Sequence, residues 1–271
     1  MDWLREVYSG EPILMRFSML LVLVMGRVSG MVMTAPLFST STLPMRLRGL
    51  LAVAMTLLIM PLQWSAAFDM PVTLIDAAVL LGAELLIGIL LGMGVMIIFS
   101  GVQVAGQLIG QLAGMSLADV FNPGFNDNVP LLSQLLFYVT LAVFVTIGGH
   151  RRIVEALLET YTAIPVGGGG LPKGMIDVVT TLLSQSFVLG VRAAAPAMTA
   201  LLLSTLIMGL ISRTMPQLNI MAFGFGLNAL VTLGSLAVSL GAIAWIFQNE
   251  IDGVFDTFTQ MLKGQSAASS Q

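Results

Sequence analysis

Long apolar runs, separated by short polar or proline- and glycine-containing segments, make up most of this 271-residue sequence. A helix needs about 20 consecutive apolar residues to cross the hydrocarbon core of a bilayer. The longer regions 74–118 and 176–211 each have room for one more crossing. The pattern therefore predicts an all-α, polytopic membrane protein, with apolar runs near 13–33, 49–68, 74–100, 131–149, 176–211 and 218–247.

Composition supports the membrane class and excludes several kinds of site. Only 9% of the residues are charged and the mean hydropathy is +0.96, whereas soluble domains are roughly a quarter charged. Without cysteine, neither a disulfide framework nor a thiolate metal site is possible. The mixed-charge start and the lack of a small-residue cleavage site favour mature protein over a cleaved signal at Met1–Met33. No basic cluster indicates nucleic-acid binding.

The distribution of basic loops conflicts with a simple topology. Loops 34–48 and 150–175 carry arginine or lysine, so the positive-inside rule predicts that both are cytoplasmic. A single crossing over 74–118 would put them on opposite sides. Two resolutions stay open: a helical hairpin that turns near Phe99–Gly101, or a protein that lies partly outside the bilayer.

Five charged residues interrupt apolar runs. A charge at the bilayer centre costs about 2.5–3.5 kcal/mol on insertion scales, so these side chains are expected to face protein or water. We expect the two nearer helix ends to snorkel and the three deeper ones to be paired or to face a wet interior. The first two are Arg16 and Asp76, and the other three are Arg27, Glu84 and Arg192.

No constellation of catalytic residues can be assembled. His150 is the single histidine and follows an apolar run, where a helix cap or an interfacial residue is expected. The glycines at 167–170 favour a loop tip over a phosphate cradle, since no G-K-[ST] follows. We therefore predict a protein that is not an enzyme, with no catalytic, cofactor-binding or metal-binding residues.

A ladder of small residues gives the strongest packing signal. Glycines recur every four residues at 26 and 30, at 88 and 92, and at 106, 110 and 114, and such repeats let helices approach closely. Gln103, Gln107 and Gln111 run beside the last row, rotated by about 60° in helix geometry. This flat, amide-bearing face suits contact with other subunits or with a watery channel better than contact with lipid. Asn122-Pro123-Gly124 then breaks the helix.

Several motifs in a fixed order resemble the FliR/SctT family, the single-copy export-gate subunit of flagellar and type III secretion systems. The resemblance covers nearly the whole chain, and its most specific part is R-x-x-PQLNI at 213–220, followed by GFGL. The other motifs are APLFSTSTLPMRLRGLLAVAMTLLIMP, GAELLIGILLGMG, GQLIGQLAGMSLADVFNP, GGH, AIPVG and AAAPAMTALLLSTLIMGLIS. The amino acids found in these motifs favour the flagellar branch of the family over the injectisome branch.

The resemblance implies a structural part of a protein-export channel in the bacterial inner membrane, within the flagellar basal body. In the family, one such chain assembles with five FliP/SctR-like and four FliQ/SctS-like subunits into a helical cone, much of it above the membrane plane. Larger export-gate subunits, unfolded proteins in transit and membrane lipid are the other implied partners, with no nucleic acid and no cofactor. The implied fold has helical hairpins and broken helices, and resembles a fusion of the two partner folds.

The resemblance also assigns residues to roles. The loop near 114–128 is expected to plug the closed pore, and some relatives have aromatic residues at positions 117 and 120, so sealing here should depend more on Phe121 and Phe125. Glu84 is assigned to buried assembly chemistry and Arg213 to a helix end near a partner. The full plug set is Met115, Leu117, Val120, Phe121 and Phe125; the packing and assembly set is Gly88, Gly92, Gly106, Gly110, Gly114, Gln103, Gln107, Gln111, Glu84, Arg213, Pro216 and Gln217.

Residues 1–258 are expected to form one helical domain, with a disordered tail at 259–271. The rival hypothesis is a secondary transporter, in which Glu84, Arg192 and the broken helix at 101–130 would supply midplane groups. That hypothesis predicts an internal repeat, and the glycine ladder with its Asn-Pro-Gly break has no counterpart after residue 176.

Overall fold

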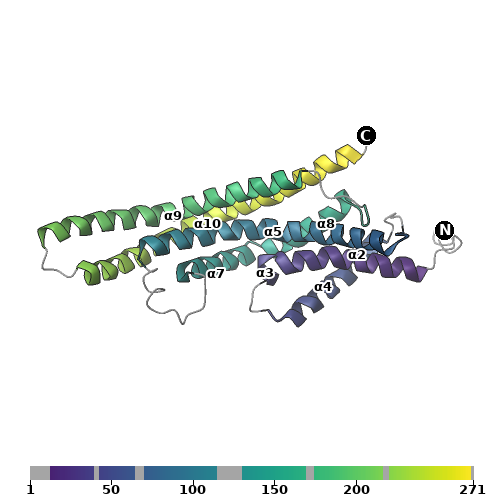
Figure 1. Cartoon of the computed structure of the whole chain (residues 1–271), viewed down its shortest axis with the longest axis horizontal. Helices are drawn as coiled ribbons and strands as arrows, with labels where there is room; N and C mark the ends of the chain where they lie inside the picture. Colours follow the sequence, from purple (N-terminus) through teal and green to yellow (C-terminus); the bar gives the residue numbers. More distant parts are fainter. Residues whose placement is uncertain are drawn as a thin grey trace. The chain divides into compact units, whose positions relative to one another are not determined.

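A computed structural model of the chain describes residues 13–39, 43–64, 70–114, 130–168, 174–215 and 220–269. Within these ranges every regular element is helical, as Figure 1 shows, so the all-α prediction is confirmed. The elements are α2 (Ile13–Thr34), α3 (Pro36–Ser39), α4 (Met45–Ile59), the 3₁₀ helix η1 (Met60–Gln63), α5 (Leu74–Leu112), α7 (Leu131–Thr146), α8 (Gly149–Ala163), α9 (Met175–Thr214) and α10 (Ile220–Ser269).

Helix α5 continues through Phe99–Gly101, where one of the two topology alternatives predicts a hairpin turn. It runs for 39 residues without a break at Phe99–Gly101, so a hairpin there is wrong. Four of the described helices are long and apolar enough to cross a membrane. Two bent helix pairs could each supply one further crossing, which would give up to six crossings. Hydropathy alone leaves the topology unresolved because α5 is much longer than one crossing.

Local signals explain where several helices begin and end. Thr73 and Asp76 form a capping box at the start of α5, with the Asp76 carboxylate accepting from the Thr73 backbone N–H at 3.1 Å. This confirms that Asp76 lies at a helix end. Pro130 is the N-cap of α7, and Gly148, with a φ of 79°, is the N-cap of α8. Helix α10 continues through most of 259–271.

The chain divides into two compact units. Unit 1 contains residues 1–96, 148–180 and 254–271, and unit 2 contains residues 97–147 and 181–253. The first part of α5 therefore belongs to unit 1 and its last part to unit 2.

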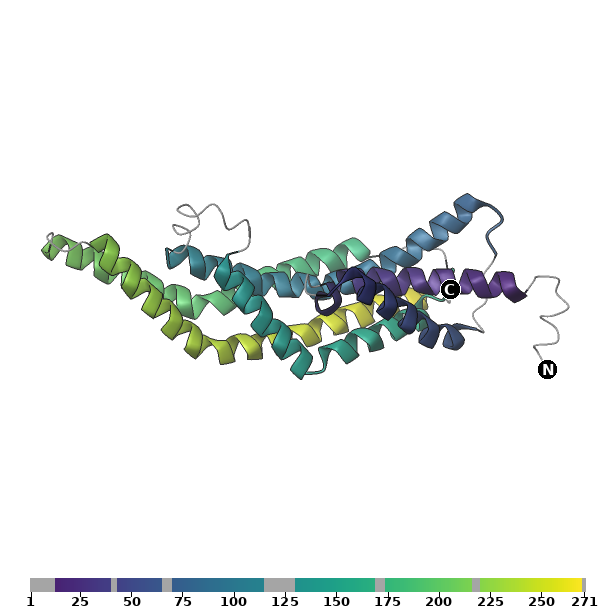
Figure 2. The same ribbon diagram turned by 90° about the horizontal axis from the view of Figure 1, so that it is seen from below.

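In unit 1, α2 is the central helix. It contacts α3, α4 and η1, and its glycines lie against the first part of α5. Figure 2 shows α2 with α4 on one side and α5 on the other. Gly26 lies near Leu81, and Gly30 lies near Leu85 and Ile89, so α2 and α5 run parallel.

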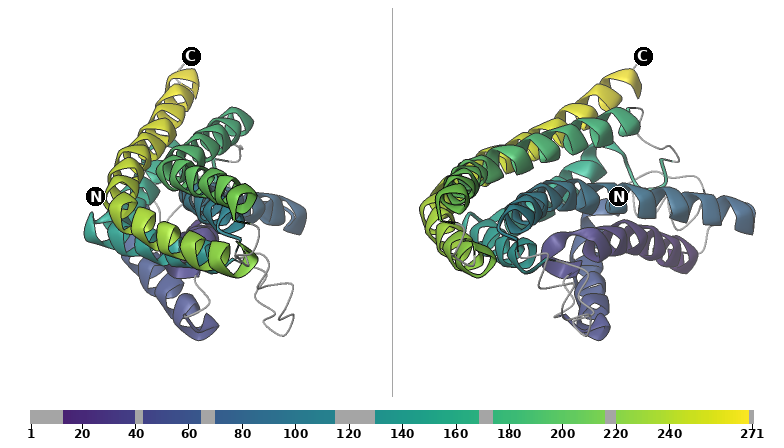
Figure 3. Two further views of the ribbon diagram at one scale, coloured as in Figure 1. Left: turned by 90° about the vertical axis from the view of Figure 1, so that its left-hand side faces the viewer. Right: turned by 60° about the vertical axis from the view of Figure 1, so that its left-hand side comes forward.

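In unit 2, three helical segments meet at an aromatic core. The Phe99 ring makes edge-on contacts with Phe137, Phe144 and Phe247, with centroids 5.1–5.6 Å apart. These contacts join α5, α7 and α10. Helices α9 and α10 lie side by side, as Figure 3 also shows, and a hydrogen bond of 2.9 Å between Ser204 and Asn228 joins them in an antiparallel hairpin.

Candidate functional sites

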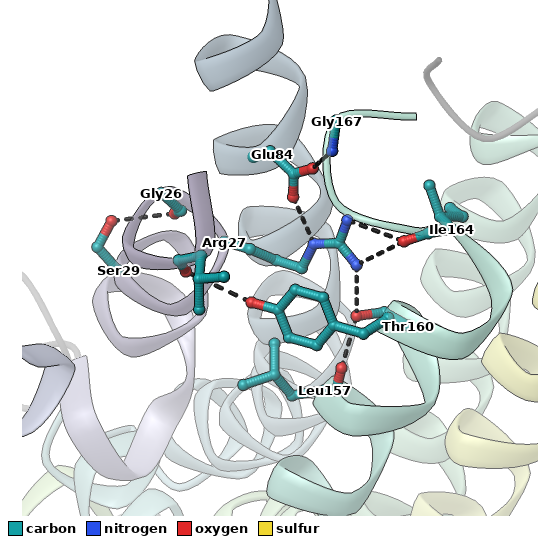
Figure 4. Close-up of polar contacts among 10 residues, drawn as sticks. Gly26, Arg27, Ser29, Glu84, Leu157, Thr160, Ile164 and Gly167 are labelled. Carbon is teal, nitrogen blue, oxygen red and sulfur yellow. Dashed lines mark hydrogen bonds and ion pairs between the residues drawn. The ribbon is translucent and has the colours of Figure 1, made fainter. Parts of the chain in front are cut away.

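Arg27 of α2 is the largest fully buried side chain of unit 1 and lies at the centre of a polar cluster. Its Nε donates to the Glu84 carboxylate at 2.6 Å. Its two terminal nitrogens donate to the Ile164 carbonyl, both at 3.1 Å, and Nη1 also donates to the Thr160 hydroxyl at 3.1 Å. Figure 4 shows the guanidinium enclosed by these acceptors. The Tyr161 ring covers it at 4.2 Å, in a cation–π contact.

Glu84 of α5 is 3% exposed and has both carboxylate oxygens occupied. One oxygen accepts from Arg27, and the other accepts from the Gly167 backbone N–H at 3.0 Å. The Arg27–Glu84 pair therefore fixes α2 to α5 and also holds the backbone that follows α8. We call these residues, with Thr160, Tyr161, Ile164 and Gly167, the buried clamp.

The clamp explains why two charges are tolerated so deep in an apolar unit. Removing ions from water is expensive, and mutual attraction repays this only where geometry is good and the remaining hydrogen-bonding groups are satisfied. Here the guanidinium makes four hydrogen bonds and the carboxylate makes two. Of the two alternatives predicted for the deep charges, pairing inside the protein is thus the one that holds for Arg27 and Glu84.

Sequence reasoning missed the α8 side of this clamp. Thr160 and Ile164 lie 133 and 137 positions from Arg27, and although Ile164 belongs to the AIPVG motif, nothing in that motif indicates a contact with Arg27. An available signal was the amphipathic pattern of α8, which buries Ile153, Leu157 and Tyr161 on one face.

Two predicted packing glycines, Gly88 and Gly92, lie where α5 meets α2. A Cβ atom on Gly88 would collide with the Arg27 carbonyl oxygen, and one on Gly92 would come within 2.7 Å of the Ala35 nitrogen. Both positions are buried. Glycine at these sites brings the two helices close enough for the clamp residues to meet.

A second set of close contacts, the glycine seam, lies in unit 2 and consists of Gly101, Gly106, Gly190, Ser133 and Ser186. A Cβ on Gly106 would lie 2.6 Å from the Ser133 Cα, and one on Gly190 would lie 2.6 Å from the Gly101 carbonyl oxygen. The Ser133 hydroxyl donates to the Gln103 carbonyl at 2.9 Å, and Ser186 donates to Ile97 at 2.5 Å. The seam joins α5 to α7 and to α9.

The glycine row is not uniform along α5. Gly110 is buried, but the nearest atom to a Cβ placed there is a Leu132 methyl carbon at 3.8 Å. Gly114 has a φ of 78° and open space around it, so it supplies the left-handed backbone that ends the helix. Gln103 is half-buried, whereas Gln107 and Gln111 are exposed.

The remaining assigned residues fall at or beyond helix ends. Arg213 is exposed at the end of α9. Pro216 and Gln217 lie outside the described residues, as does segment 115–129 with its five proposed plug residues.

The other deep charge has a partner but is not buried. Arg192 forms an ion pair of 3.7 Å with Glu250, and its side chain is 65% exposed in the chain by itself. Glu84, the other acidic or basic group named in the transporter hypothesis, is paired with Arg27. Among the described residues, no group of three or more histidine, aspartate or glutamate side chains could hold a metal ion.

Comparison with known proteins identifies the family of this chain. The sequence pattern of the family described as bacterial export proteins, family 1, matches residues 18–254. The chain belongs to the bacterial export proteins of family 1. The resemblance drawn from the motifs is therefore confirmed.

Curated members of bacterial export family 1 match over most of their length. The chain is 31% identical to the flagellar biosynthetic protein FliR of Escherichia coli K12, over 87% of this chain and 90% of that protein. It is 28% identical to the FliR of Caulobacter vibrioides, over 88% and 94%, and 26% identical to the FliR of Bacillus subtilis, over 89% and 93%. Together with its apolar helices, these matches make the chain a membrane component of the flagellar export apparatus.

Proposed function

We propose that this chain is a structural subunit of the channel through which a bacterium exports flagellar proteins. It lies in the inner membrane with part of its length above the bilayer plane. It assembles with five FliP-like and four FliQ-like subunits and contacts the larger export-gate subunits. Unfolded proteins pass through the assembled channel, and the energy for export comes from other components.

The length of apolar helix α9 supports this assembly. Helix α9 has 40 residues, which corresponds to about 60 Å at 1.5 Å per residue. Even a tilt of about 40° leaves roughly 46 Å along the bilayer normal, against a hydrocarbon thickness of about 30 Å. Only 28% of its most apolar window is buried inside the chain. The apolar surface beyond the bilayer therefore needs other protein subunits to cover it.

The loop near 114–128 closes the resting channel. It begins at Gly114, where α5 ends with a left-handed residue, and it directly follows the exposed amides of Gln107 and Gln111. A polar helix face that leads into an apolar loop suits a wet path that ends in a seal. Phe121 and Phe125 are the main sealing side chains.

Deletion of residues 117–125 tests the plug. The chain is co-expressed with its two small partner subunits, and assembly is followed by co-purification. The expected result is an intact complex whose membranes leak small solutes, because the seal is lost while the helices that bind the partners remain. An assembled deletion variant that keeps its permeability barrier would contradict the plug role.

Substitutions within the loop provide matched controls. Phe121→Ala and Phe125→Ala should each raise the leak, whereas Asn126→Ala and Asn128→Ala alter polar positions of the same loop and should leave the barrier unchanged. The chain alone in vesicles should transport no solute. Solute-specific flux by the lone chain would support the transporter hypothesis instead.

A further inference from the structure

Helix α8 differs from the rest of the chain in its charge. Four of its 15 residues are charged, whereas the preceding helix α7 has none and only 9% of the whole chain is charged. The charged side chains are all exposed, and so is the imidazole of the single histidine. We call these five residues the charged face of α8: His150, Arg151, Arg152, Glu155 and Glu159.

The opposite face of α8 is fixed inside unit 1. Ile153, Leu157 and Tyr161 are at most 2% exposed. Thr160 accepts a hydrogen bond from Arg27, and the Tyr161 ring covers the same guanidinium. Because α8 cannot rotate about its axis without breaking the buried clamp, its charged face is held outward in one orientation. A surface that is fixed in advance loses little conformational entropy when it binds a partner.

The order of the charges does not serve the helix itself. The first turn contains Arg151 and Arg152 and no acidic residue, although the N-terminus of a helix favours acidic side chains. Arg151 precedes Glu155 by four residues, which is the less favourable order for an ion pair on a helix. The two side chains are 79% and 57% exposed, so their pairing contributes little to stability. Helix stability therefore does not explain why the basic residues come first.

We propose that the charged face of α8 binds another protein subunit of the export apparatus, whose surface is acidic opposite residues 150–152 and basic opposite Glu155 and Glu159. Anionic lipid headgroups attract basic residues alone, whereas a protein surface complements both signs in a fixed order and thereby fixes the register of the contact. The inference rests on the proposed assembly into that apparatus and is independent of the plug.

Reversal of one pair of charges tests this surface. Arg151→Glu/Glu155→Arg keeps the net charge of the helix but places the acid first, which is the order that favours the helix. Arg151→Lys/Glu155→Asp is the matched control because it keeps the order of the signs. Each full-length variant is co-expressed with the two small partner subunits and the larger export-gate subunits. The measurements are the thermal midpoint of the purified chain, the yield of co-purified complex and the swimming of a complemented strain.

The reversed variant should keep or slightly raise the thermal midpoint, while complex yield, swimming or both fall several-fold, because the partner then meets like charges. The control should behave as the wild type does. Normal yield and swimming of the reversed variant would overturn the inference, since a face that meets only water or headgroups tolerates the reversal.

Two other results would also overturn the inference. A lower midpoint of the reversed variant would show that the charge order serves folding, and an equal loss of swimming in the control would show that the order of signs is not what matters. Failure of the wild-type chain to co-purify with these subunits would instead contradict the proposed function.

Discussion

The two units of this chain hold their helices together in different ways. Unit 1 uses the buried clamp, with an ion pair of 2.6 Å between Arg27 and Glu84. Unit 2 uses the glycine seam, where backbones approach so closely that a single Cβ at Gly106 would lie 2.6 Å from Ser133. Both units bring helices together at glycines, including Gly88 and Gly92 in unit 1, but only unit 1 adds a buried ion pair to that close contact.

The difference follows from the number of backbone N–H and C=O groups that have no partner within a helix in each unit. In unit 1, the chain leaves the helix after Ala163, so the Ile164 carbonyl and the Gly167 N–H need partners in an apolar environment. Unsatisfied backbone groups away from water cost several kcal/mol each. In unit 2, the seam joins helical segments whose backbone groups are mostly paired within each helix. Close packing is then enough.

The largest expected effect comes from breaking the clamp. Glu84→Leu leaves the Arg27 guanidinium buried without its counter-ion and removes the acceptor of the Gly167 N–H. Loss of one partner of a buried ion pair costs about 3–5 kcal/mol. We expect a large drop in the thermal midpoint of the purified full chain in detergent.

Two further variants test whether the pair itself is responsible. The double variant Arg27→Leu/Glu84→Leu should lose less stability than the sum of the single variants, since it leaves no unpaired charge. Glu155→Gln removes an exposed ion pair with Arg151 and should leave the midpoint unchanged. If Glu84→Leu behaves like Glu155→Gln, the clamp does not stabilise unit 1.

A smaller effect is expected from filling the seam. Gly106→Ala forces α5 and α7 apart because the new methyl group meets the Ser133 backbone. Overpacking of this kind costs about 1–3 kcal/mol. The expected result is a lower unfolding midpoint together with a weaker complex with the partner subunits.

Gly110→Ala is the matched control, one helical turn away in the same row. Its nearest neighbour is 3.8 Å away, and alanine favours helix by up to about 1 kcal/mol relative to glycine. This variant should be neutral or slightly more stable. Equal losses at both positions would show that the seam does not depend on close approach.

The smallest effect on stability is expected at the amides beside the seam. Gln107 and Gln111 are exposed in the chain by itself, so Gln107→Ala/Gln111→Ala should not change its unfolding midpoint. If this face contacts other subunits, the same variant should lower the yield of complex on co-purification and reduce swimming in a complemented strain. Normal assembly and motility of this variant would show that the two amides are not part of an interface with other subunits.

Local features of the fold could be predicted from the sequence. Asp76 was expected at a helix end and caps α5. The glycine row on α5 was expected to pack closely, and Gly88, Gly92 and Gly106 do so. The row alone could not show that Gly110 has room and that Gly114 ends the helix, because the neighbours come from another part of the chain.

An all-α membrane protein of the bacterial export family could be predicted from the amino-acid sequence alone, since hydropathy, helix length and motif order are all read along the chain without knowledge of which helices pack together. Which deep charges are buried with their partners became visible only in the packed helices. Arg27 meets Glu84 across 57 positions and Thr160 across 133 inside unit 1, whereas the Arg192 side chain pairs with Glu250 and is 65% exposed. Such pairings depend on the register in which distant helices pack, and no local pattern encodes that register.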